Sequence, residues 1–175
     1  METHELTAHP AYPPWAVTSV TARILSRDKN WLRLRWRIEG SGKLLVPAFA
    51  GKGRADELWH TTCFELFLKP GVGTAYCEFN LSPSSKWAAY DFSAFRELMG
   101  DAPVEAIAVA CAHDERELVL QADIASELPV PASVALNAIV EDKAGNMQFW
   151  ALAFADGKPE FHSETCRGLR VEARP

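Results

Sequence analysis

Hydrophobic and polar residues alternate along much of this chain, with the two-residue period of a β-strand. The clearest segment is 31–38, where Leu32, Leu34, Trp36 and Ile38 alternate with Arg33, Arg35 and Arg37. In an extended strand this spacing puts the apolar side chains on one face and the arginines on the other. The segment therefore predicts a strand with one buried face and one face in solvent.

Strand-like segments recur about every ten residues, separated by turn residues and short hairpin-type links. Parallel strands would need crossover helices, so the pattern predicts an all-β fold, an antiparallel two-sheet β-sandwich of jelly-roll-like form. One short helix is expected over Ser93 to Met99, with Ser93 as its N-cap and Gly100 at its end. The expected strands are 17–25, 31–38, 44–49, 61–68, 76–81, 86–92, 104–112, 117–124, 134–141 and 148–154.

Length and charge narrow the domain organisation and the partners. The chain has 175 residues, which fits a single domain. Three of its eleven prolines lie in the first fourteen residues, so 1–14 is expected to be an irregular lead-in to one domain over 15–175. The net charge of −5 and the lack of a long basic run argue against a nucleic-acid partner.

The N-terminus has no basic start followed by an apolar stretch, and no window approaches the ~18 apolar residues of a membrane span. We therefore expect a cytoplasmic protein with no membrane partner. The four cysteines are scattered without a CxxC pair, which argues against a structural zinc. A reducing cytoplasm also disfavours disulfides.

The segment 61–81 is the richest in candidate chemistry. Its two strands are expected to pair with Glu65 opposite Glu78, Cys63 opposite Asn80, and Phe67 opposite Tyr76. This register separates an apolar face from a face that carries both carboxylates and the amide. Opposed carboxylates are destabilising unless a polyol, a cation or a basic side chain relieves them, or one is protonated.

Aromatic and basic residues flank this hairpin, with Trp59 before it and Lys86 and Trp87 after it. Rings that stack on a sugar face, beside polar groups that bind its hydroxyls, are a common way to hold a saccharide. The alternative, which the residue pattern alone favours, makes Trp59 and Trp87 ordinary core residues and pairs Glu65 with an arginine of segment 31–38.

Three stretches resemble a known family. LWHTTCFELFLKP and YCEFNLSPSSKWAAYDF are similar to the central signature of the DOMON-like and family-9 carbohydrate-binding-module sandwiches, and PEFHSETCRGLRV resembles their closing turn and last strand. The middle hairpin is the specific part of this resemblance. It implies a jelly-roll-like sandwich that binds a ligand, usually a saccharide and sometimes haem.

The resemblance also implies roles for individual residues. Trp59 would be the first stacking ring, Glu65 the hydroxyl acceptor and Lys86 the basic donor, while Phe161 or His162 would replace the second ring. The usual acidic pair before the strand is replaced here by His60, Thr61 and Thr62. The predicted ligand-binding residues are Trp59, Glu65, Glu78, Asn80, Lys86, Trp87 and His162.

The predicted function is non-catalytic binding of a saccharide-like small molecule, with no obligatory cofactor, although calcium and haem remain open. A glycosidase could use Glu65 and Glu78 as its carboxylate pair, but a small sandwich with short loops rarely forms the deep cleft that it needs. Nucleophile-elbow, P-loop, GxGxxG and HExxH motifs are absent from the sequence.

Two other functions remain open. A haem module would take Met99 or Met147 with His113 or His162 as axial ligands. A protein-interaction module without a small ligand would use Trp59 and Trp87 as a contact patch.

Overall fold

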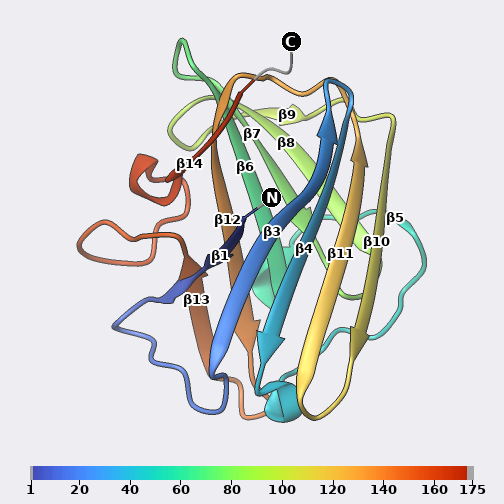
Figure 1. Ribbon diagram of the computed structural model, residues 1–175, viewed down its shortest axis with the longest axis vertical. Coiled ribbons are helices and arrows are strands. Elements are labelled where there is room, and N and C mark those ends of the chain that lie inside the picture. The colour runs from blue at the N-terminus through green and yellow to red at the C-terminus, as the bar shows by residue number, and fades with distance from the viewer. Residues whose placement is uncertain (1, 173–175) are drawn as a thin grey trace.

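Segment 31–38 forms β4 (Trp31–Glu39), the middle strand of a five-stranded antiparallel sheet, in the computed structural model, which describes residues 2–172. Leu34, Trp36 and Ile38 are fully buried, as the alternation predicts. The sheet has the order β1 (Thr3–Glu5), β3 (Ser19–Asp28), β4, β11 (Glu117–Ala125) and β10 (Ala106–His113), and it forms the front layer of Figure 1.

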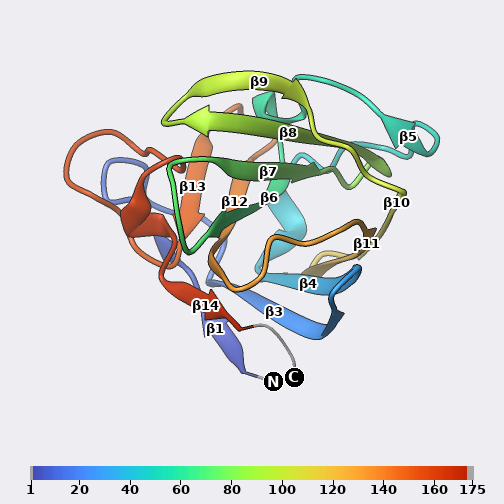
Figure 2. The same ribbon diagram turned by 90° about the horizontal axis from the view of Figure 1, so that it is seen from above.

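A nine-stranded sheet packs behind the first. Its main order is β2 (Thr7–Ala8), β13 (Met147–Ala151), β12 (Ala132–Glu141), β6 (Cys63–Pro70), β7 (Tyr76–Leu81), β8 (Lys86–Ala94) and β5 (Gly53–Arg54). In addition β14 (Leu169–Val171) pairs with β12, and β9 (Glu97–Asp101) pairs with β8. The short β5 runs parallel to β8, and the other pairs described are antiparallel. The predicted two-sheet β-sandwich is confirmed, and Figure 2 shows its layers end-on.

The nine-stranded sheet is buried on both faces in its middle. One face supplies the inter-sheet core with residues such as Phe64, Leu66 and Phe79. The opposite face, which we call the outer face, carries a second apolar cluster. This outer cluster consists of Phe67, Tyr76, Phe92, Ala135, Ile139, Ala151, Phe161 and Cys166. The outer face is therefore covered by other parts of the chain rather than open to water.

The expected helix over Ser93 to Met99 is wrong. That segment is the turn of a hairpin, in which β8 ends at Ala94 and β9 begins at Glu97. Arg96 turns the chain with a positive φ of 57°, and β9 then pairs back onto β8. Pairing to the existing sheet edge thus overrides the local helical tendency. The helices found in residues 2–172 are three 3₁₀ turns, η1 (Ser41–Lys43), η2 (Leu58–His60) and η3 (Glu164–Cys166).

Two further expectations differ from the structure. The first fourteen residues are not wholly irregular, because β1 pairs with β3 and β2 pairs with β13. Segment 44–49 forms no strand and contributes a single bridge, from Leu44 to Asp142. Within residues 2–172, no helix has the length and apolar character needed to cross a bilayer.

The β6–β7 hairpin forms, but its register is shifted by two residues from the prediction. Glu65 lies opposite Asn80, and Phe67 lies opposite Glu78. The alternation of side chains specifies which face each residue occupies, and a two-residue shift leaves the faces unchanged. Both carboxyls therefore still share the outer face, as diagonal neighbours rather than a direct pair.

Candidate functional site

A pocket of about 670 Å³ opens on the outer face of the nine-stranded sheet. Its floor is formed by β6, β7 and β8, and its walls come from the η2 segment, the β8–β9 hairpin and the segment between β13 and β14. Figure 2 shows β9 extending the sheet beyond β8, and the β13–β14 segment lying outside β13. The volume falls in the range of small-molecule sites.

A row of polar residues crosses the outer face of the sheet, and its middle member, Glu65, lines the pocket. Asn137 of β12, Glu65 of β6 and Asn80 of β7 stand side by side in register. Their exposed fractions are 0%, 3% and 1%. Both amide atoms of Asn137 and the Oδ1 of Asn80 lack hydrogen-bond partners within the described chain. Buried polar groups without partners are costly, so this row is a strong indicator of a bound polar molecule.

Burial controls the ionisation of the two carboxyls. Desolvation raises the pKa of Glu65 well above its usual 4.5, and repulsion from Glu78 raises it further. The Asn137 side chain partly opposes this shift, although no hydrogen bond of normal geometry joins the two residues. Burial also raises the pKa of Glu78 to about 7, against opposing contributions from Asn80 and Arg96. Burial therefore favours the protonated form of Glu65, and near neutral pH Glu78 is divided between its two forms.

A tyrosine–histidine pair lies beside Glu78. The Tyr76 hydroxyl accepts a hydrogen bond from the Arg96 backbone N–H at 3.1 Å, which leaves its own proton to donate to Nδ1 of His162, 2.6 Å away. We therefore assign the imidazole proton to Nε2, which lies 3.6 Å from a Glu78 carboxyl oxygen. Burial and the nearby Arg96 lower the pKa of His162 to about 4, so its ring is neutral at pH 7.

Aromatic rings form the upper walls. Trp59 belongs to η2, is 47% exposed and stacks on His60 with 3.7 Å between ring centroids. Tyr90 of β8 donates its hydroxyl proton to Asp56 at 2.6 Å. Phe92, Phe149 and Phe161 also line the pocket. An apolar wall above a polar floor suits a ligand that has both kinds of surface.

The structure brings most of the predicted site residues together. Trp59, Glu65, Glu78 and His162 line the pocket, and Asn80 pairs with Glu65 on the same face without lining the pocket itself. Phe161, proposed as a substitute for the second ring, is also in the wall.

Lys86 and Trp87 do not line the pocket. Trp87 is one residue further along β8 than Lys86, so it points to the inter-sheet face, where it packs against the core and under the Arg54 guanidinium. The Lys86 Nζ lies at the start of the strand and donates to the Lys52 backbone carbonyl at 3.4 Å. The two residues therefore have structural contacts at the edge of the sheet.

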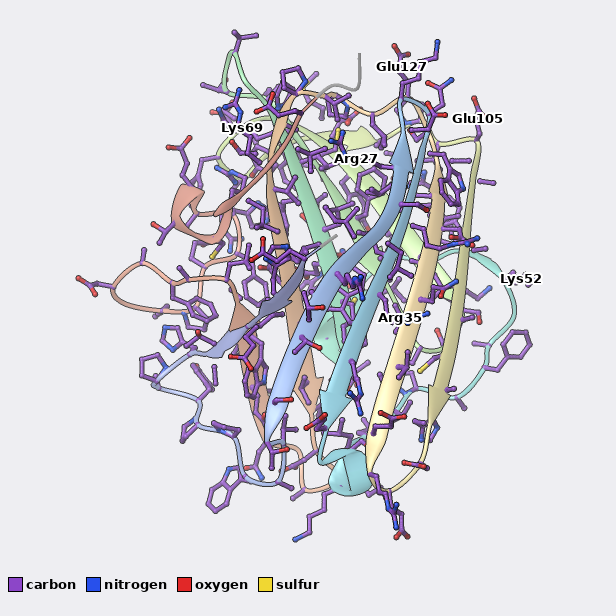
Figure 3. The ribbon with its side chains drawn as sticks, in the orientation of Figure 1. Arg27, Arg35, Lys52, Lys69, Glu105 and Glu127 are labelled. Carbon is purple, nitrogen blue, oxygen red and sulfur yellow. The ribbon has the colours of Figure 1, made fainter. Side chains whose placement is uncertain are left out.

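The alternative interpretation of the carboxylate is wrong. No arginine of β4 reaches Glu65, because Arg33, Arg35 and Arg37 lie on the solvent face of the other sheet. There they contact Asp123, Gln121 and Glu117 of the neighbouring strand. Figure 3 shows Arg35 on the face of the five-stranded sheet that points away from the second sheet.

Sequence reasoning missed several pocket residues. Tyr90 could have been found, because it alternates with Ala88 and Phe92 on the strand face that Glu78 shares. Asp56, Arg96 and Glu160 come from loops that only the tertiary fold brings to the pocket, and no local pattern marks them.

Of the residues considered for haem, Met147 of β13 packs against the outer cluster, and the other three are placed apart or already engaged. His113 ends β10 in the five-stranded sheet, Met99 is 71% exposed on β9, and Nδ1 of His162 is engaged by Tyr76. Within residues 2–172, no group of three or more His, Cys, Asp or Glu side chains could hold a metal ion.

No protein-family model matches the chain, and no curated protein sequence matches it either. Among solved structures, it is similar to the crystal structure of a proposed carbohydrate-binding protein from Bacteroides uniformis ATCC 8492. The TM-score is 0.61, with 14% sequence identity over 94% of this chain and 83% of that one. At this identity the likeness establishes a shared β-sandwich fold.

Proposed function

We propose that the protein binds a saccharide or a related polyol in the pocket on the outer face, without catalysing a reaction on it. The observation that carries the proposal is the buried carboxyl of Glu65, which lines the pocket and is flanked in its row by two amides with unpartnered atoms. A ligand rich in hydroxyls would supply the partners that this row lacks.

The raised pKa of Glu65 favours its neutral form, which suits such a ligand. A neutral carboxylic acid has one donor and one acceptor, and each amide also offers both. A sugar hydroxyl likewise donates and accepts, so it can bind next to each of these groups. Glu78 adds a second carboxyl, and Nε2–H of His162 adds a donor beside it.

The aromatic wall supports the same proposal. The half-exposed indole of Trp59 can stack on the C–H face of a sugar ring, while Phe149 and Phe161 line the pocket beside it. The structural neighbour described as carbohydrate-binding has the same fold. Membership of the DOMON-like and family-9 binding-module group remains part of this proposal.

Calorimetric titration with a panel of mono- and oligosaccharides tests the proposal. We expect at least one to bind, and we expect Trp59→Ala and Glu65→Ala each to weaken that binding about tenfold or more, which equals ~1.4 kcal/mol, whereas Glu65→Gln, which keeps a donor and an acceptor, should lose less. Arg35→Ala, on the opposite sheet, is the matched control and should leave the affinity unchanged. Absence of binding heat for the whole panel at millimolar concentrations would overturn the proposal.

A further inference from the structure

The pocket on the outer face has a strong imbalance of charge. Six carboxyl side chains line it, those of Asp56, Glu57, Glu65, Glu78, Asp101 and Glu160, and Arg96 is the one guanidinium among the lining residues. His162 adds no positive charge at neutral pH, because its pKa is lowered to about 4.

The single guanidinium is already committed. Nε and Nη2 of Arg96 donate to the two carboxylate oxygens of Glu160 at 2.9 and 3.0 Å. This bidentate pair neutralises both groups and occupies the Nε–Nη2 edge of the guanidinium. Arg96 therefore keeps N–H donors but offers little net positive charge to the carboxylate or phosphate of a sugar derivative.

The other carboxyls are only partly compensated. Asp101 lies 3.4 Å from the Arg54 guanidinium, which also donates to two backbone carbonyls and lies over the Trp87 ring. Glu57 is 4.0 Å from Nε2 of His60, at the limit of an ion pair. The Asp56 carboxylate accepts a hydrogen bond from the hydroxyl of Tyr90, which is a neutral group. The rim at Asp56 and Glu57 therefore presents uncompensated negative charge.

The floor and walls supply evidence independent of this rim. The exposed fraction of Glu65 is 3%, and no hydrogen bond of normal geometry to its carboxyl is found within residues 2–172. The buried carboxyl therefore indicates that a ligand completes the site. The rings of Trp59 and Tyr90 stand at the same pocket, and aromatic faces attract cations as well as sugar C–H groups.

We propose that the ligand class of this pocket is a positively charged polyol, an amino sugar with a protonated amine, rather than a neutral or an acidic sugar. The inference rests on the proposed function and specifies its ligand. The ammonium group would lie toward the carboxylates of Asp56 and Glu57, and the hydroxyls would bind the row of Glu65 and its flanking amides. A uronic acid or a sugar phosphate would meet uncompensated carboxylates and would be repelled.

Matched ligands separate charge from size and from ring geometry. Calorimetry at low salt would compare glucosamine with glucose, N-acetylglucosamine and glucuronate, and would repeat the set in the galacto and manno configurations. We expect the amine of the preferred configuration to bind about tenfold more tightly than its neutral parent and the uronate to bind least, with a preference that shrinks as salt rises.

The possible outcomes are distinct. If the neutral sugar binds as tightly as the amine, or the uronate binds best, the charge inference is overturned and saccharide binding survives. If no sugar of any charge binds, the proposed function fails as well. If tetramethylammonium binds as tightly as the amino sugar, the pocket recognises a cation without a polyol, and the amino-sugar assignment is overturned.

A charge variant tests the rim directly. Asp56→Asn removes the negative charge and keeps an oxygen that can accept the Tyr90 proton. We expect it to reduce the preference for the amine from about tenfold to about threefold while the affinity for the neutral sugar stays within about twofold. Glu115→Gln, an equal charge change in the β10–β11 turn, is the control and should leave the preference intact. An unchanged preference in Asp56→Asn would contradict the assignment of the rim.

Discussion

The two outward faces of this sandwich differ in how their charged residues are buried and paired. On the five-stranded sheet, Arg33 and Arg37 stand in water and each pairs with a carboxylate of β11. On the nine-stranded sheet, Glu65 and Glu78 are buried, and no lysine or arginine side chain of the described residues forms an ion pair with either. One face therefore has exposed charges with partners, and the other has buried acids without cations.

This difference separates a surface that serves solubility from one that serves recognition. Exposed cross-strand pairs contribute little to folding, but they keep a sheet face soluble and discourage association. Buried acids and unpartnered amides lower stability, and a folded protein retains them at a site where another molecule supplies the missing partners. In the nine-stranded sheet, the groups that lower stability in this way lie at and beside the floor of the pocket.

Of the substitutions that test this difference between the two sheets, replacement of Phe67 should change the free energy of unfolding most. This ring is fully buried in the outer cluster and packs edge-on against His162, 5.1 Å between centroids. We expect Phe67→Ala to lower the free energy of unfolding by about 3–5 kcal/mol in denaturant titrations, because it leaves a cavity. Phe67→Leu should cost far less, and Arg35→Ala on the other sheet about 0.5 kcal/mol or less. Equal losses in Phe67→Ala and Arg35→Ala would show that the outer cluster is not a packed core.

The buried acids should also make stability depend on pH. The raised pKa values of Glu65 and Glu78 mean that the folded protein holds protons that the unfolded chain releases above about pH 4.5, so stability falls as pH rises through the folded-state pKa values. His162 acts in the opposite direction, but only between its folded pKa of about 4 and its ordinary 6.5. Above pH 6.5 the carboxyls dominate at first, and the buried cysteine thiols, whose pKa values are raised above the ordinary 9, add to the decline as pH approaches 9.

We therefore expect wild-type stability to decline by about 1–3 kcal/mol between pH 6.5 and pH 9. Glu65→Gln should reduce this decline and be more stable than the wild type at pH 9, because its amide cannot ionise in the buried site. Denaturant titrations at several pH values measure both effects. A Glu65→Gln protein with the same pH profile as the wild type would show that Glu65 is not a desolvated acid.

The sequence predicted which face of each strand a residue occupies, but not which residues contact one another across the fold. The alternation in 31–38 predicted the exposed arginine row, and the parity of positions in 61–81 put Glu65 and Glu78 on one face. The predicted register was wrong by two residues. The face pattern could not exclude this error, because a shift of two leaves every residue on the same face. The Tyr76–His162 contact and the Arg96–Glu160 pair join residues far apart in the chain, so no local pattern could predict them.

The smallest effect is expected on the arginine face. Asp123→Asn removes the carboxylate that pairs with Arg33, and both side chains are substantially exposed. We expect a loss of about 1 kcal/mol or less, reduced further by salt. A larger loss that persists in high salt would mean that this face contributes more to folding than its exposure indicates. The same denaturant titrations, repeated at two salt concentrations, provide the measurement.

The central claim is that Glu65 and Glu78 are desolvated acids that a ligand completes, and NMR titration of their side-chain carboxyl carbons tests it most directly. In the free protein the account predicts that Glu78 titrates with a pKa of about 7 and Glu65 with a pKa above its ordinary value. Saturation with the bound saccharide should shift both resonances. Titration of both groups between pH 4 and 5, with no response to any sugar, would contradict the account.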